Sequence, residues 1–113
     1  MSTIPAISLD ELTTELQLGK IDQFWNVLTD RYFDGTLIPG SRRVPLDQVG
    51  REVAGGAIPW DAAIVVYCAN YDCPQSAQAV EKLRAFGYTN VRAYEGGLEE
   101  WAQSGLALVR RAA

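Results

Sequence analysis

The chain has 113 residues, 48% of them hydrophobic and 21% charged, which are the proportions of a globular protein with a single core. Ten Lys and Arg against fourteen Asp and Glu give a formal net charge of -4, so neither nucleic acid nor an anionic membrane is expected as a partner. The chain has no histidine, which excludes catalytic pairs of the Ser-His and Cys-His types and most zinc sites.

The N-terminal stretch "MSTIPAISLDELTTEL" lacks the basic segment and apolar core of an export signal. No apolar stretch approaches the roughly 20 residues that a membrane helix needs. We therefore expect a cytoplasmic protein.

A helix and a strand are predicted at the start of the chain. Ser8 and Glu11 have the spacing of a capping box, and leucines recur after them at roughly helical intervals. This pattern predicts a helix over 8–18. The run "FWNVL" at 24–28 has the aromatic and branched composition of a buried strand.

The next segment is rich in turn-forming residues. Glycines and prolines punctuate "DRYFDGTLIPGSRRVPLD", which we expect to be an ordered connection with one helical turn near 31–33. Residues 46–54 are predicted to form a short helix, which ends at the following pair of glycines.

Strands and helices alternate in the second half of the chain. The continuous apolar run at 62–68 is typical of a strand that is covered on both faces in a parallel sheet. A helix is predicted over 74–86, a strand over 89–94 and a short helix over 96–105. The sequence therefore predicts one α/β domain, with a mainly parallel central sheet flanked by helices on both faces.

Two cysteines lie near the end of the predicted central strand. Cys68 ends the strand, and Cys73 lies in the polar loop that leads into the next helix. Ligands of parallel sheets bind at the carboxyl ends of strands, and the thiol pKa of a cysteine falls near a helix N-terminus. Cys68 is therefore the preferred nucleophile, the alternative being a small buried hydrophobe.

The role of Cys73 has three possible interpretations: a second nucleophile, a resolving thiol that attacks a sulfur species on Cys68, or an inert loop residue. A structural disulfide between two cysteines is unusual in a reducing compartment, which favours reactive thiols. Two thiols without histidine leave a zinc shell short of ligands, so we expect no metal. No other cofactor is expected.

Backbone amides of the loop could curl around the sulfur and stabilise an anion or a persulfide there. The Ser76 hydroxyl could add a further donor. The residues predicted to form this substrate-binding loop are Ala69, Asn70, Tyr71, Asp72, Pro74, Gln75 and Ser76.

Three stretches resemble the rhodanese-like family of single-domain sulfurtransferases. "IVVYC", a loop and "SAQAVEKLRAFGYTNVRAYEGGLEEWAQSGLAL" resemble the active-site strand, the helix after it and the C-terminal Gly-Gly, Trp and Gly-Leu pattern of the family. "LIPGSRRVPLD" resembles its His-Ile-Pro-Gly-Ala segment, and "ISLDELTTEL" its opening helix. The resemblance implies a sulfurtransferase that carries sulfane sulfur as a persulfide on Cys68.

The chain departs from the family pattern in its loop. The stretch from Cys68 to Ser76 is two residues longer than in most catalytic members, and alignment from the helix side would place the nucleophile at Asn70. Cys73 is therefore an alternative to Cys68. The loop also lacks Arg and Lys, which hold dianions such as thiosulfate and phosphate best.

Other positions of the family pattern differ too. Asn26-Val27-Leu28 stands where the family commonly has Asp-Val-Arg, and Leu37 where it has His. We interpret these changes as a rearranged connection between strand and loop, the alternative being divergence away from catalytic turnover. Arg31, Arg42 and Arg43 could attract an anion to the pocket, the alternative being solvated surface charges.

The leading hypothesis is a sulfurtransferase or sulfur carrier. It would take sulfur from a small sulfane-sulfur donor or a persulfide-bearing protein and pass it to a thiol acceptor. The alternative hypothesis is a non-catalytic rhodanese-like module that binds partners or senses oxidation through the pair Cys68 and Cys73.

Overall fold

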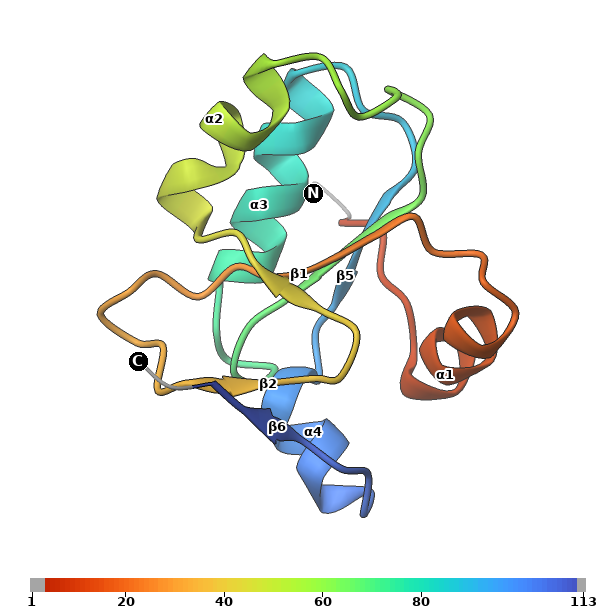
Figure 1. The fold of residues 1–113 in the computed structure, drawn as a ribbon, viewed down its shortest axis with the longest axis vertical. Coiled ribbons are helices and arrows are strands. Elements are labelled where there is room, and N and C mark those ends of the chain that lie inside the picture. Colours follow the sequence, from red (N-terminus) through yellow and green to blue (C-terminus); the bar gives the residue numbers. More distant parts are fainter. Residues whose placement is uncertain (1–3, 112–113) are drawn as a thin grey trace.

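A computed structural model describes residues 4–111 of the chain. A parallel sheet in the strand order β3-β1-β4-β5 forms its centre (Figure 1). The strands are β1 (Gln23–Asn26), β3 (Arg42–Arg43), β4 (Ile64–Tyr67) and β5 (Val91–Tyr94). Among the described residues, no helix is long and apolar enough to cross a membrane.

Helices cover both faces of the sheet, as predicted. One face packs against α2 (Val49–Ala54) and α3 (Gln75–Ala85), and the other against α1 (Leu9–Gln17) and α4 (Gly97–Gln103). In Figure 1, α2 and α3 lie together beyond one side of the sheet, with α1 and α4 away from them. The predicted capping box at the start of α1 is confirmed by reciprocal hydrogen bonds between Ser8 and Glu11.

The position of strand β4 in the sheet explains why its sequence is apolar throughout and does not alternate between apolar and polar residues. Ile64 and Val66 belong to the core on the α2 and α3 face, and Val65 and Tyr67 to the core on the α1 and α4 face. Successive side chains of a strand point to opposite faces, so a central strand in a covered sheet needs apolar residues at every position. All four side chains are fully buried.

The structure differs from the sequence prediction in its short elements. Residues 46–54 are not one helix: a 3-10 turn, η1 (Leu46–Gln48), precedes α2. Strand β3 was not predicted, nor was the antiparallel ribbon of β2 (Thr36–Leu37) and β6 (Val109–Arg110). Each of these strands has two residues, too few to show a hydrophobic period.

The strands of the central sheet end at one common edge, where the candidate loop lies. Tyr67, the last residue of β4, buries its hydroxyl there, and burial raises the pKa of this phenol. The hydroxyl accepts a hydrogen bond of 3.0 Å from the Ile38 amide and lies 2.6 Å from the Ser41 hydroxyl. It thereby ties the turn after β2 to the end of the central strand.

Tyr67→Phe is expected to lower the free energy of unfolding by about 1–3 kcal/mol, because it leaves the buried Ile38 amide without its acceptor. Chemical denaturation measures the change. Tyr32→Phe, which removes a hydroxyl from an exposed ring, is the control and should shift stability by less than about 0.5 kcal/mol. Equal losses in the two variants would contradict the assigned role of Tyr67.

Candidate active-site loop

The loop between β4 and α3 brings the two cysteines together. Cys68 and Cys73 form a disulfide, with their Cα atoms 6.4 Å apart. Reactive thiols were expected in preference to a structural disulfide; in this structure the two sulfurs are joined, because the loop brings Cys73, five positions further along the chain, back to Cys68. Cys68 is 1% exposed, and Cys73 is partly exposed.

The start of α4 holds the Cys68 end of the loop. The Leu98 amide donates to the Cys68 carbonyl at 3.1 Å, and the Glu99 amide donates to the Ala69 carbonyl at 2.9 Å. Gly97 lets the two backbones come this close. Its φ is +60°, and a Cβ there would meet the Cys68 carbonyl oxygen and lie 2.8 Å from the Ala69 carbonyl carbon.

Asn70 folds the middle of the loop. Its side-chain oxygen accepts from the Asp72 amide at 3.0 Å, and its carbonyl accepts from the Cys73 amide at 3.1 Å. Two of the amides that were expected to surround a sulfur anion are thus already bonded. The amides of Asn70, Tyr71 and Gln75 have no acceptor among residues 4–111 and could serve an anion.

A cavity of about 360 Å³ opens beside the loop. Leu28 and Tyr32, from the connection after β1, form one wall. The other wall comes from the loop and the start of α3, and consists of Ala69, Asn70, Asp72, Cys73, Pro74 and Gln75. The described lining includes a carboxylate and no Lys or Arg.

Three predicted site residues lie outside this lining. Cys68 is buried behind the loop, and Ser76 is 1% exposed in the first turn of α3. Tyr71 is 67% exposed, and its hydroxyl donates to the Glu100 carboxylate at 3.1 Å, a bond that raises the pKa of the phenol. Of the two cysteines, Cys73 is the one that faces the cavity.

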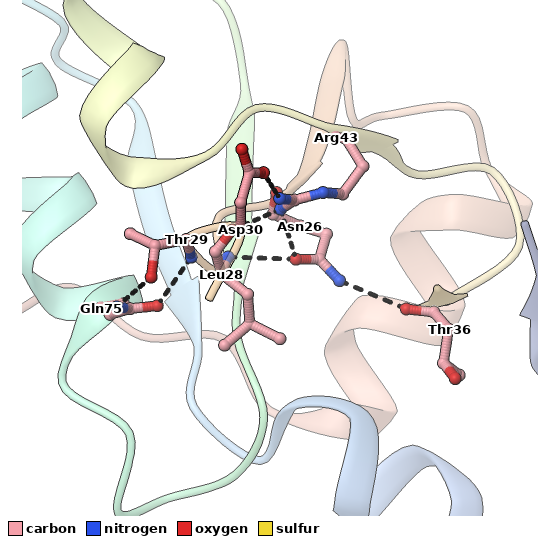
Figure 2. Close-up of polar contacts among 7 residues, drawn as sticks. All are labelled: Asn26, Leu28, Thr29, Asp30, Thr36, Arg43 and Gln75. Atoms are coloured by element: carbon pink, nitrogen blue, oxygen red, sulfur yellow. Dashed lines mark hydrogen bonds and ion pairs between the residues drawn. The ribbon is translucent and has the colours of Figure 1, made fainter. Parts of the chain in front are cut away.

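Arg43 contributes to the structure of the site and is not a solvated surface charge. Its side chain is 12% exposed and lies 4.0 Å from the centre of the Phe33 ring. Its guanidinium donates to the Leu28 carbonyl and to the carbonyl and side-chain oxygens of Asn26, and pairs with Asp30 at 2.8 Å (Figure 2). With its donors used in this way, Arg43 is not available to attract an anion.

The substituted tripeptide is part of the same network. The Asn26 side-chain oxygen also accepts from the Leu28 amide at 3.0 Å, and its nitrogen donates to the Thr36 carbonyl at 3.4 Å. In this structure the Asn26 side chain therefore holds together the two ends of the connection after β1. Figure 2 also shows Gln75 bonded to Thr29, a contact between the two cavity walls that the sequence did not reveal.

Comparisons with known proteins agree with this architecture. The family model of the Rhodanese-like domain matches residues 8–104. No curated protein sequence matches the chain at a significant level.

Several solved structures share the fold. Thiosulfate sulfurtransferase from Pseudomonas aeruginosa is 21% identical with a TM-score of 0.81, over 97% of this chain and 21% of that protein. The chain therefore spans about a fifth of the Pseudomonas enzyme. The rhodanese-like domain of the Anabaena Alr3790 protein is 23% identical with a TM-score of 0.78, over 96% of this chain and 80% of that one. The human single-domain sulfurtransferase TSTD1 is 23% identical with a TM-score of 0.75, over 89% of this chain and 97% of that one.

Gly97→Ala is expected to destabilise the protein by about 2–4 kcal/mol, because the new Cβ collides with loop backbone in addition to the strain of a positive φ. Gly105→Ala is the matched control. Gly105 has φ +79° with open space around its Cβ position, so its replacement should cost only about 1 kcal/mol. Denaturant unfolding compares the two, and equal losses would show that the close contact of α4 with the loop is unimportant.

Proposed function

The chain belongs to the rhodanese-like domain family, and on that premise we propose that it is a sulfurtransferase or sulfur carrier with a persulfide on Cys68 as its intermediate. The observation that carries the proposal is the position of Cys68 and Cys73. The two sulfurs lie within bonding distance of each other after the central strand, where Cys73 faces a cavity that a small molecule could enter and Cys68 lies buried behind the loop.

Loading and transfer are two displacements at sulfur. The Cys68 thiolate attacks the outer sulfur of a donor R–S–SH, a new S–S bond forms, the donor S–S bond breaks, and R–S⁻ leaves. An acceptor thiolate R′–S⁻ then attacks that outer sulfur, which yields R′–S–SH and returns the Cys68 thiolate. Electrons and protons balance in both steps without a cofactor.

Cys73 can end the cycle as a resolving thiol. Its thiolate attacks the inner sulfur of the Cys68 persulfide, which forms the Cys68–Cys73 disulfide and releases HS⁻. Recovery needs two equivalents of a thiol reductant, which become a disulfide themselves. Because Cys73 faces the cavity, the first reductant thiolate attacks the Cys73 sulfur and displaces Cys68 as a thiolate. Such reductants are abundant in the cytoplasm, the location that we propose.

The cavity favours an uncharged organic persulfide, or a persulfide-bearing protein, as donor and a thiol as acceptor. Leu28, Tyr32 and Pro74 offer apolar surface, and Asp72 would repel an anion. Thiosulfate, a dianion, would find free backbone amides but no guanidinium or ammonium group in the described lining.

A second candidate function is a thiol redox module that senses oxidation without sulfur transfer. The disulfide between Cys68 and Cys73 favours it, since the loop already holds the oxidised form. The two functions differ in the fate of an added sulfane sulfur, which only the transferase delivers to an acceptor.

Mass spectrometry tests the loading step. The reduced wild-type chain, treated with an alkyl persulfide, is expected to gain the mass of one sulfur atom. Cys68→Ala should gain none, whereas Cys73→Ser should keep the added sulfur longer, because it has no resolving thiol.

A wild-type chain that gains no sulfur would contradict the transferase assignment and favour the redox module. An unchanged gain in Cys68→Ala would contradict the choice of nucleophile. Peptide mapping of the loaded chain then shows whether Cys73 carries the sulfur.

An added cation should improve the reaction with thiosulfate. Ala69 contributes to the cavity lining, and Ala69→Arg is expected to raise the rate of sulfur loading from thiosulfate about tenfold, an effect that added salt should weaken. Gln78→Arg places the same charge on an exposed position of α3 outside the lining and should leave the rate within about twofold of wild type. A wild-type rate with thiosulfate equal to that with an alkyl persulfide would contradict the proposed donor preference.

A further inference from the structure

We propose that Gln75 is a positioning residue for Cys73, and that its clamp on Thr29 keeps Cys73 within reach of Cys68 when the disulfide is open. The inference rests on the proposed function, because the resolving step needs Cys73 to stay near Cys68 after the disulfide is reduced. It concerns neither the nucleophile nor the donor.

The clamp consists of two reciprocal hydrogen bonds between the segment after β1 and the start of α3. The Thr29 amide donates to Gln75 Oε1 at 3.1 Å, and Gln75 Nε2 donates to Thr29 Oγ1 at 3.1 Å (Figure 2). Both residues are half-buried, so water competes only partly for these bonds. Among residues 4–111, no other side-chain hydrogen bond joins the segment 28–33 to the segment 68–76.

Hydrogen bonds and an ion pair of the neighbouring residues hold Thr29 in place, so that it is a well-positioned partner for Gln75. On one side of it, the Leu28 carbonyl accepts from Arg43 and the Leu28 amide donates to Asn26. On the other side, Asp30 pairs with Arg43. The Thr29 carbonyl also accepts from two amides, those of Tyr32 at 2.9 Å and Phe33 at 3.1 Å. The clamp therefore connects the hydrogen-bonded network around Arg43 to the start of α3.

Gln75 in turn fixes the Cys73 end of the loop. Only Pro74 separates the two residues, and its ring restricts the backbone between them. The Cys68 end is held independently, because α4 amides bind the carbonyls of Cys68 and Ala69. With both ends anchored outside the disulfide, reduction leaves the two sulfurs close, and the clamp raises the effective concentration of one thiol at the other.

The experiment measures the equilibrium between the reduced and disulfide forms of the full chain in buffers of reduced and oxidised glutathione, with no sulfur donor present. Gln75→Leu, which removes both hydrogen bonds at nearly constant volume, should lower the effective concentration about five- to twentyfold. Thr29→Val removes one bond and should lower it about three- to fivefold. Thr29→Ser keeps both bonds and should stay within twofold of wild type.

Gln78→Leu is the matched control, an exposed glutamine one turn further along α3, and should leave the equilibrium unchanged. The double variant Thr29→Val with Gln75→Leu should be no worse than Gln75→Leu alone, because the second change removes a bond already lost. General destabilisation would weaken the reduced and oxidised folded forms alike, so it would lower the melting temperature without moving this equilibrium.

An equilibrium in Gln75→Leu within twofold of wild type, or an equal loss in Gln78→Leu, would overturn the inference. If Gln75→Leu does not fold, the contrast between Thr29→Val and Thr29→Ser decides: equal values overturn the inference, and the stated difference supports it. Because the assay contains no sulfane sulfur, its outcome is separate from that of the loading experiment, and a failure of the clamp is distinguishable from a failure of the proposed function.

Discussion

The site depends on one backbone contact, the approach of the start of α4 to the first two residues of the loop. Gly97 permits it, and the amides of the next two residues donate hydrogen bonds to the carbonyl oxygens of Cys68 and Ala69. Because these carbonyls are turned toward α4, the loop leaves β4 in a defined direction and returns Cys73 to the sulfur of Cys68. A side chain at Gly97 would remove both the contact and the turn that follows from it.

The rest of the site divides into a rigid frame and a reactive loop. Arg43 is the centre of the frame, because its guanidinium donates to the segment after β1. Thr29 of that segment is in turn hydrogen-bonded to Gln75 at the end of the loop. The use of Arg43 in the frame also explains the chemistry that we propose. With no free cation in the described cavity lining, charge on sulfur must be stabilised by backbone amides, which suits a singly charged thiolate or persulfide better than a dianion.

The sequence predicted the central architecture because strong local signals encode it. The continuous apolar run of β4 indicated a strand covered on both faces, and the alternation of strands and helices after it indicated a parallel sheet. The short strands β2, β3 and β6 were missed because their pairing depends on partners far away in the chain. The role of Arg43 was missed for the same reason, since the sequence around a single arginine does not indicate which distant carbonyl groups it will bind.

Delivery of sulfur to a second molecule tests the central claim most directly. The chain would be loaded with one sulfur, separated from its donor and mixed with one equivalent of a small thiol in a single turnover. The proposed transferase predicts that the acceptor appears as its persulfide while the chain returns to its unloaded mass. Release of the sulfur only as HS⁻, with formation of the disulfide between Cys68 and Cys73 and no acceptor persulfide, would contradict sulfur transfer and favour the redox module.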